Sequence, residues 1–333
     1  MPKREAHRAR PGGVATDRPS PDPWAEQSPK RRTTPAVICI GVDAGGSSTT
    51  VALSKDGTFV RETTAGAANA TTSGIDTAAG VIVAGVRSAA EGEEPAAIYI
   101  AAAGSGRKST THALRERIAT AFPRAKVVVA DDTVIALRAA VPEGDGAVLI
   151  AGTGSVAYAV HGEREHRAGG LGYLAGDEGS AFWIGMQAAK LYGRVLDGRA
   201  NRDETTDLVS RALHAPDRDA FIAALYDAPL QPAAIASIAP SIIAFAGKGN
   251  RASTKIVQQA AQELGDLIKA ALKAVDLIEA SPTVAFAGGL LRENSLLSFL
   301  LETRLIGDVP GITIVKAADD PARAALRLAE RLG

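Results

Sequence analysis

The chain is 333 residues long and carries 37 basic and 37 acidic residues, so its formal net charge is zero. That length favours two domains, and the balanced charge gives no electrostatic reason to expect nucleic acid or an anionic membrane as the main partner. The single cysteine, Cys39, excludes a disulfide framework and a cysteine-held iron–sulfur or zinc site. The apolar runs are shorter than the roughly 20 residues that a bilayer-spanning helix needs. We therefore expect a cytoplasmic protein that acts on small molecules.

Residues 1–34 differ in composition from the rest of the chain. They hold six prolines among many charged residues, and such a segment buries too little apolar surface to offset the entropy lost on ordering. We expect a disordered basic tail.

Residues 35–141 predict a first α/β lobe. Three strands come first, at 36–43, 49–57 and 58–66, with an Asp56-Gly57 turn typical of a hairpin between the last two. Helices and strands then alternate: helix 71–92, strand 96–104, helix 109–122, strand 125–130 and helix 132–141.

Residues 142–333 predict a second lobe that opens in the same way as the first. The segment 146–163 has an apolar strand, a tight turn of glycine and hydroxyl residues and an alternating strand, which indicates internal duplication. A mostly helical insertion follows from 177 to about 279, with breaks around 215–217 and 229–232. The predicted close is strand 283–289, helix 294–305, strand 311–317 and a terminal helix from about 321. We expect an α/β fold in which helices cover both faces of each sheet.

Three glycine turns follow predicted buried strands: Gly45-Gly46-Ser47-Ser48-Thr49, Gly152-Thr153-Gly154-Ser155 and Gly288-Gly289. Glycine lets successive backbone N–H groups converge on an anion, and hydroxyl side chains add donors. An ordinary hairpin explains any one of these turns, but three at strand ends predict phosphate binding. The GxxxxGK[ST] and GxGxxG patterns are absent, so neither a P-loop nor a Rossmann site is expected.

Three aspartates stand at the ends of predicted strands. Asp43 ends the first strand, two residues before Gly45 of the first glycine turn, where it can either anchor Mg²⁺ beside the phosphates or cap the turn. Asp131 and Asp132 follow a buried strand where a helix begins. Either can cap that helix, and a carboxylate at this end of a strand is also placed to act as the base for a substrate hydroxyl.

Several motifs, taken in order, resemble one family: GVDAGGSST, VADDTVIAL, AGTGSVAYAV, GGLGYLAGDEGSAFWIG and FAGGLL. They are similar to the BadF/BadG/BcrA/BcrD ATPase family and, within it, to the N-acetylglucosamine kinase-like sugar kinases of the actin-like ATPase superfamily. The resemblance covers about residues 37–333, and GDEGSAFW with the upstream AGTGS is its most specific part. It implies two actin-like (ribonuclease H-like) lobes around a nucleotide cleft, use of ATP and Mg²⁺, and a homodimer.

The resemblance also implies roles for individual residues. Asp43 and the turn from Gly45 to Thr49 would match the first phosphate motif, the turn from Gly152 to Ser155 the second, and Gly288-Gly289 the loop near adenosine. Asp132 would be the catalytic aspartate that accepts the proton of the sugar's 6-hydroxyl. The other sugar-contacting positions would be Asn69, Thr153, Gly170, Leu171, Asp177 and Glu178.

The implied activity is phosphorylation of N-acetylglucosamine or a close relative, and alternatives stay open. Leu171 stands where related amino-sugar kinases often have tryptophan, so glucosamine or another hexose is an alternative substrate. Carboxylates suit sugar hydroxyls, but Asp177 can instead cap a helix beginning near Ser180, with Glu178 favouring its dipole. An alternative of another class is an ATP-driven activator or regulatory module. Such activators hold a cluster with cysteines, which Cys39 alone cannot do.

Overall fold

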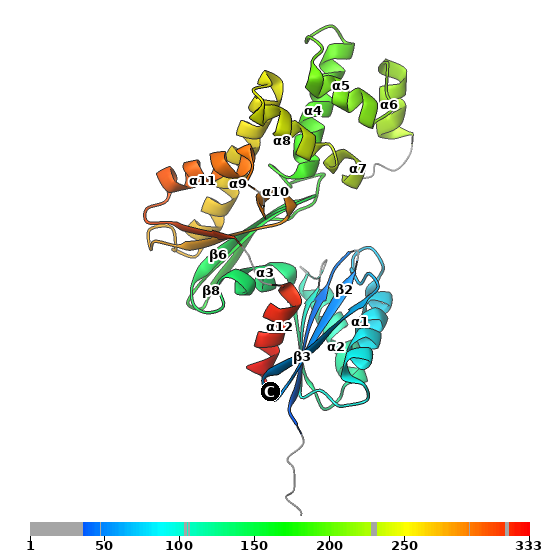
Figure 1. The fold of residues 1–333 in the computed structure, drawn as a ribbon, viewed down its shortest axis with the longest axis vertical. Coiled ribbons are helices and arrows are strands. Elements are labelled where there is room, and N and C mark those ends of the chain that lie inside the picture. The colour runs from blue at the N-terminus through cyan, green and yellow to red at the C-terminus, as the bar shows by residue number, and fades with distance from the viewer. Residues whose placement is uncertain are drawn as a thin grey trace, which may run out of the picture. The chain divides into compact units, whose positions relative to one another are not determined.

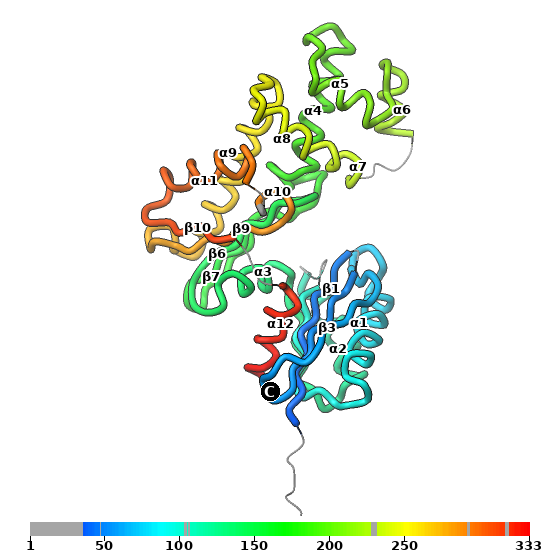
Figure 2. Tube along the Cα trace, viewed as in Figure 1, coloured from blue at the N-terminus to red at the C-terminus, as the bar shows by residue number. Residues whose placement is uncertain are grey.

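The computed structural model describes residues 36–46, 48–102, 105, 107–227, 232–292, 294–316 and 320–333. In these ranges the chain forms two five-stranded sheets and the helices that cover them (Figures 1 and 2). The predicted tail, residues 1–34, and the predicted phosphate-binding Ser47 lie outside the described residues.

The first sheet has the strand order β3-β2-β1-β4-β5. Its strands are β1 (Ile38–Ala44), β2 (Thr49–Lys55), β3 (Thr58–Ala65), β4 (Ala97–Ala102) and β5 (Lys126–Asp131). The first three form an antiparallel meander, and β4 and β5 run parallel to β1. The central strand β1 is buried on both faces, which explains its continuous apolar sequence.

Helices on opposite faces of the first sheet contact alternate residues of β1. Ile40 and Val42 pack in a cluster with α1 (Ile75–Ala90) and α2 (Lys108–Ala121). Cys39 points the other way, into a cluster with Leu326 and Ala329 of α12 (Pro321–Glu330). The predicted boundary grouped all of residues 142–333 with the second lobe, and α12 departs from it. An apolar stripe specifies that a helix is covered, not which sheet covers it.

The second sheet repeats the arrangement of the first. Its strands are β6 (Gly146–Ala151), β7 (Ser155–His161), β8 (Arg164–Gly169), β9 (Thr283–Ala287) and β10 (Thr313–Lys316). The order β8-β7-β6-β9-β10 has the same antiparallel meander followed by two parallel pairings. This topology confirms the predicted duplication. The strand β8 was not predicted, because its sequence Arg-Glu-His-Arg-Ala-Gly is that of an exposed, charged edge strand.

The predicted helical insertion consists of several helices and not one long one. They are α4 (Ala181–Leu196), α5 (Glu204–Ala212), α6 (Arg218–Tyr226), α7 (Pro232–Ala236), α8 (Ala239–Gly247) and α9 (Arg251–Ala274). After β9 come α10 (Gly289–Arg292) and α11 (Leu296–Asp308). Side-chain caps fix most of the helix starts, because Ser180, Asp203, Asp217, Asn250 and Ser295 each accept a bond from a backbone N–H.

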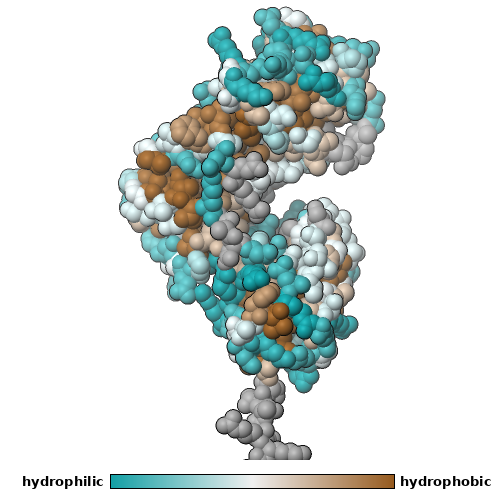
Figure 3. Space-filling model, viewed as in Figure 1, coloured by the Kyte–Doolittle hydropathy of each residue, from teal (hydrophilic) through white to brown (hydrophobic). Residues whose placement is uncertain are grey.

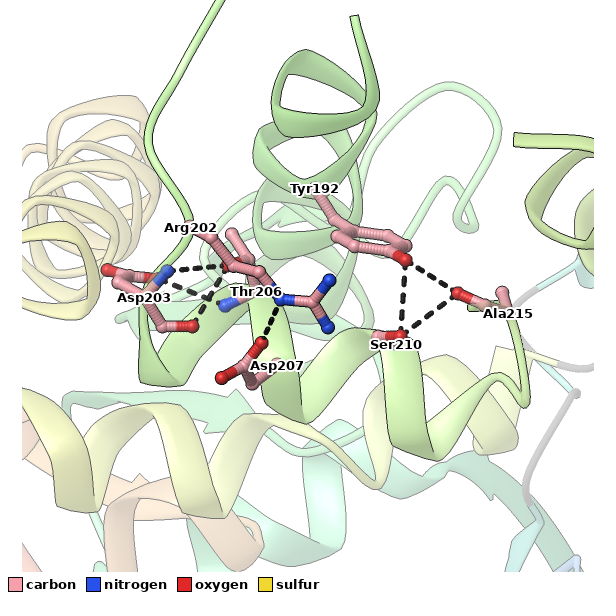
Figure 4. Close-up of polar contacts among 7 residues, drawn as sticks. All are labelled: Tyr192, Arg202, Asp203, Thr206, Asp207, Ser210 and Ala215. Carbon is pink, nitrogen blue, oxygen red and sulfur yellow. Dashed lines mark hydrogen bonds and ion pairs between the residues drawn. The ribbon is translucent and has the colours of Figure 1, made fainter. Parts of the chain in front are cut away.

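A buried polar cluster sets the break between α5 and α6 (Figure 4). The Tyr192 hydroxyl of α4 donates to the Ala215 carbonyl at 2.6 Å and lies 3.1 Å from Ser210 Oγ, which also donates to that carbonyl, at 3.0 Å. At the start of α5, Asp203 and Thr206 form a reciprocal capping box. Side chains thus bond the Ala215 carbonyl, which lies beyond the end of α5. The break between α5 and α6 falls at the predicted position, 215–217.

Two surface properties of the helices are notable. Phe299 and Ile306, on α11, are 64% and 67% exposed, and hydrophobic surface over this helix is visible in Figure 3. Across the described ranges, no single helix combines the length and apolar composition needed to cross a membrane. Only Pro232–Gly247 and Arg251–Ala274 taken together, bent by 112°, meet that criterion.

Helix α3 (Asp132–Ala140) packs against both sheets. On one side, Ile135 and Ala139 contact Ala101 of β4 and the helix α12. On another, Leu137 contacts Val148 and other apolar residues of the second sheet. The two sheets therefore share the element on which Asp132 stands.

The close approach of α12 to β1 depends on Gly41. A Cβ atom at this position would lie 2.1 Å from the Leu326 backbone nitrogen and 2.4 Å from the Ala322 carbonyl oxygen. Backbone atoms cannot move aside as a flexible side chain can, so Gly41→Ala should force α12 away from the sheet. We expect a loss of about 3 kcal/mol of unfolding free energy, the upper part of the range for overpacking, measured by chemical denaturation.

Gly80→Ala is the matched control for this substitution. Gly80 is an exposed residue inside α1, and apart from its chain neighbours and the backbone of its own helix no atom lies within 4 Å of an added Cβ. This variant should gain stability by about 0.8–1 kcal/mol from helix propensity. Equal effects of the two substitutions would show that the Gly41 contact does not hold α12 in place.

Candidate functional site

The first glycine turn is tied to the segment that follows β3. The Gly45 N–H donates to the Ser48 carbonyl at 2.9 Å, and the Gly45 carbonyl accepts from the Ala68 N–H at 3.0 Å. Thr49 is fully buried and its hydroxyl donates to the Gly66 carbonyl at 2.8 Å, so this side chain supports the turn from within. Gly46 is exposed beside it.

Asn69 lies next to this turn. Its Nδ2 atom is 3.8 Å from the position that a Cβ on Gly46 would occupy. Its Oδ1 atom accepts from the Thr71 N–H at 2.9 Å and the Thr72 N–H at 3.3 Å, which fixes the side chain. The structure therefore brings a predicted sugar position and a predicted phosphate turn together.

The second glycine turn is bonded to the acidic pair. The Ser155 N–H donates to Asp177 Oδ1 at 3.2 Å, and the Ser155 hydroxyl donates to the Glu178 carbonyl at 2.8 Å. A Cβ on Gly154 would lie 2.8 Å from Asp177 Oδ2, so the turn needs glycine there to admit the carboxylate. Burial, followed by the charge of Glu178, raises the pKa of Asp177 against the opposing effect of the Ser155 bond.

Asp177 does not cap α4. Ser180 caps that helix by accepting from the Trp183 N–H at 3.2 Å. The interpretation of Asp177 as a helix cap is therefore wrong, because its carboxylate faces Ser155 instead. The Glu178 side chain is exposed, which leaves its carboxylate accessible to a ligand.

The second and third turns line one cavity of about 450 Å³. Gly152, Thr153 and Gly289 form part of its wall, and the rest comes from Ala181, Leu290 and residues of α7 and α8. Gly288 has a φ of 86°, and a Cβ there would meet the Ala151 carbonyl oxygen at 2.3 Å. The third turn thus requires glycine to pack beside the end of β6.

Gly170 connects the second turn to β8. Its N–H donates to the Ser155 carbonyl at 2.9 Å, and its φ is 66°. A Cβ there would lie 2.6 Å from Arg167 Nη2. The next residue, Leu171, is 73% exposed, so its side chain is available to a ligand rather than used in the core.

The two adjacent aspartates have different partners. Asp131 caps α3, accepting from the Thr133 N–H at 3.0 Å and the Thr133 hydroxyl at 2.7 Å. Its other oxygen accepts from Arg167 Nη1 at 2.5 Å. The capping alternative therefore applies to Asp131, which leaves the Asp132 carboxyl free of that role.

The pKa values of the pair move in opposite directions. Desolvation by the surrounding protein, followed by the hydrogen bond and negative charge of Asp131, raises the pKa of Asp132 to about 7. The residue nevertheless keeps part of its surface exposed to solvent. Burial acts to raise the pKa of Asp131 too, but hydrogen bonds from Asp132 and Thr133 and the charge of Arg167 outweigh it and lower that pKa. Asp132 is thus the member that exchanges a proton near neutral pH.

Asp43 has a second carboxylate near it. Burial, followed by the negative charge of Asp320, raises the pKa of Asp43. Asp320 caps α12 by accepting from the Ala322 N–H at 2.8 Å. We did not predict Asp320 as a site residue, because its Asp-Pro sequence signals a helix start and says nothing of proximity to Asp43.

The pair suits a hard divalent cation. Mg²⁺ typically takes one or two carboxylates and keeps several waters, and a carboxylate whose charge is disfavoured by a second one gains from such a cation. Among the residues that the structure describes, no group of three or more His, Cys, Asp or Glu side chains could hold a metal. The two aspartates are therefore candidates for a site completed by water and substrate oxygens.

The predicted residues fall into two groups around α3. Asp43, Gly45, Gly46, Ser48, Thr49 and Asn69 gather beside the first sheet. Gly152 to Ser155, Gly170, Asp177, Glu178, Gly288 and Gly289 gather beside the second. Asp132 begins the helix that contacts both sheets.

The chain is similar along most of its length to proteins named as sugar kinases. A protein of Clostridium acetobutylicum named N-acetylmuramic acid/N-acetylglucosamine kinase is 28% identical over 297 residues, covering 87% of this chain and 97% of the relative. A glucosamine kinase of Vibrio cholerae is 26% identical over 233 residues, covering 68% of this chain and 77% of the relative.

A solved structure extends the similarity to the fold. A Chromobacterium violaceum protein assigned as an N-acetylglucosamine kinase superposes with a TM-score of 0.69 at 26% identity, covering 88% of this chain and 99% of that one. The two sheets thus have the actin-like ATPase fold. The model of the BadF/BadG/BcrA/BcrD ATPase family matches residues 40–329. The chain belongs to the BadF/BadG/BcrA/BcrD ATPase family.

Proposed function

We propose that this protein is an ATP-dependent amino-sugar kinase that phosphorylates the 6-hydroxyl of N-acetylglucosamine or a close relative. The observation that carries the proposal is the division of roles between Asp131 and Asp132. One acid caps α3 and pairs with Arg167, and the other has its pKa raised to about 7 and keeps its access to solvent. A base with such a pKa is suited to take a proton from a hydroxyl at neutral pH.

The glycine turns support binding of the nucleotide. Phosphoryl transfer depends mainly on positioning and on neutralising charge. Gly45 to Thr49 and Gly152 to Ser155 would hold the phosphates, and the cavity beside Gly289 would hold the adenosine. Asp43, with Asp320 beside it, would bind the water shell of Mg²⁺, which supplies positive charge to the phosphate oxygens.

The sugar would bind beside Asp132 and the acidic pair. Asp177 is held by the second turn and Glu178 is exposed beside it, so both carboxylates can accept hydroxyl donors of a pyranose. Asn69, Gly170 and Leu171 would complete the site, with Thr153 nearest the phosphates. The exposed leucine leaves glucosamine or another hexose as an alternative substrate.

N-acetylmuramic acid is a further candidate substrate, supported by the name of the Clostridium relative. An ATPase activator or regulatory module is the alternative of another class. Cys39 does not support it, because this thiol is buried. Burial, followed by the charge of Glu330, raises its pKa, which disfavours the thiolate that would bind a cluster.

The proposal is tested by ADP release with a panel of sugars. We expect Mg-ATP turnover to depend on an amino sugar in a panel of N-acetylglucosamine, glucosamine, N-acetylmuramic acid, N-acetylmannosamine and glucose. The product should carry phosphate on the 6-oxygen, identified by NMR. ATP hydrolysis that none of these sugars accelerates would instead favour the activator or regulatory module.

Asp132→Asn should lower turnover by about 10²- to 10⁴-fold, the usual effect of losing a general base. Binding of sugar and nucleotide, measured by calorimetry, should persist because asparagine has nearly the same shape. Turnover close to that of the wild type would reject Asp132 as the base.

Asp131→Asn is the matched control, since asparagine also caps helices well. The wild-type kcat/KM should fall as the pH drops below about 7, because Asp132 then becomes protonated. In the Asp131→Asn variant the negative charge that raises the pKa of Asp132 is gone and Arg167 keeps its own charge. The acidic limb of the profile should therefore move to lower pH, and a limb that stays in place would contradict the coupling of the pair.

Glu178→Gln should raise the KM for the sugar by about 10- to 100-fold, the value of one charge-assisted hydrogen bond. The KM for ATP should not change, because the Glu178 side chain is exposed and only its carbonyl contacts the second turn. Asp177→Asn should affect both constants, since the Asp177 carboxylate also bonds Ser155. An equal change of both constants in Glu178→Gln would indicate a structural role.

A further inference from the structure

Asp131, the neighbour of the candidate base, also lines a second cavity of about 460 Å³. Its wall includes Lys108, His112 and Arg115 from α2, Glu165 and Arg167 from β8, and Asp131. Asp132 and the predicted nucleotide and sugar residues do not line it. The cavity is therefore separate from the site described above, although it shares a border with it.

The basic residues of α2 occupy one face of that helix. Lys108, His112 and Arg115 are spaced by four and three residues, so they stand in a row. The adjacent face carries Leu114 and Ile118, which are buried in the core of the first sheet. The packing of these two residues leaves the basic row exposed, and all three of its residues line the cavity.

Within the described ranges, protein groups offset this charge only in part. Arg115 pairs with its exposed neighbour Glu116 at 2.9 Å. The side chains of Lys108 and His112 make no ion pair or hydrogen bond with any described residue. The acids of the cavity have other partners, because Glu165 accepts from the Tyr158 hydroxyl at 2.5 Å and Asp131 accepts from Thr133 and Arg167.

Arg167 connects this cavity to the candidate sugar site. Its Nη1 atom donates to Asp131, and its Nη2 atom lies beside the backbone of Gly170. A guanidinium carries five N–H donors, so the bond to Asp131 leaves others for a ligand. A ligand group that entered the cavity would therefore find Lys108 and His112 on one side and Arg167 on the other.

We propose that this cavity binds an oxyanion, a carboxylate or a phosphate, through Lys108, His112 and Arg167. The anion has two sources: a charged substituent on the sugar substrate, or a small free anion. The border with Gly170 favours the first source, and that arm alone rests on the proposed kinase function.

The first arm compares two sugars that differ in charge. N-acetylmuramic acid is N-acetylglucosamine with a carboxylate attached through an ether at O3. If the cavity takes a substituent of the sugar, Lys108→Ala and His112→Ala should each weaken binding and kcat/KM for the acidic sugar by about tenfold or more, as loss of a charge-assisted bond predicts. Binding and kcat/KM for the neutral sugar should stay unchanged.

The second arm uses inorganic phosphate and calorimetry, without sugar or nucleotide. If the cavity takes a free anion, phosphate should bind the wild-type chain, and Lys108→Ala should weaken that binding by about tenfold or more. The ratio of kcat/KM for the two sugars should then be the same in the variant as in the wild type. Loss of binding on changing Lys108 distinguishes this cavity from the glycine turns.

Lys273→Ala is the matched control, because Lys273 is an exposed lysine near the end of α9, outside the cavity wall. It should alter neither the sugar ratio nor phosphate binding. The chemical unfolding midpoint of each variant should match that of the wild type, since Lys108 and His112 are exposed. If Lys108→Ala and His112→Ala change no binding constant for either sugar or for phosphate, the cavity is not an anion site.

The failure of the proposed function would be recognised separately. In that case no sugar would be phosphorylated by the wild type, while calorimetry with N-acetylmuramic acid and with phosphate would still show whether the cavity binds an anion.

Discussion

The carboxylate of Asp131 is the interaction on which the candidate site depends. It caps α3 through Thr133 and pairs with Arg167 of β8. An acid with these partners stays charged. Together with burial, which is the larger cause, its hydrogen bond and charge raise the pKa of the neighbouring Asp132 to about 7. Because α3 packs against both sheets, the position of Asp132 follows from the packing of Ile135, Leu137 and Ala139. The local bonds set the chemistry of the acid, and the helix sets its place.

The duplicated topology explains why the glycine turns recur. In each sheet the central strand leads through a glycine turn into an antiparallel neighbour. The copies differ at the terminal helix, since α12 leaves the second sheet and covers the first. Gly41 allows that contact, and the contact brings Asp320 near Asp43. The candidate magnesium-binding pair, Asp43 and Asp320, thus depends on the close packing of α12 that Gly41 allows.

Much of this fold could be predicted because the periodicity of apolar residues and the local composition are properties of short stretches of sequence. The order of helices and strands followed from them, and the turn residues marked most of the boundaries. The strand β8 was missed because an exposed edge strand has no buried face to impose alternation. The position of α12 could not be predicted, since its apolar stripe fits any apolar surface.

The residues of the site show the same division between local and distant signals. Asp131 and Asp132 were found because both stand at a strand end, but their separate roles depend on Arg167, 35 positions beyond Asp132 along the chain. Asp177 was found as an acid, and its bond to Ser155 could not be inferred from a sequence that equally allowed a helix cap. The sequence therefore identified the acidic residues of the site, and the tertiary contacts distinguished the role of each one.

The acid at position 131 also explains why a basic cavity can lie so close to a carboxylate base. Asparagine would cap α3 as well as aspartate does, but it could not form an ion pair with Arg167. Held by Asp131, the guanidinium lines the same cavity as the basic row of α2, and its Nη2 atom lies beside Gly170. Its charge opposes the rise in the pKa of Asp132. One ion pair thus limits the basicity of the candidate base and places a cation at the border of the second cavity.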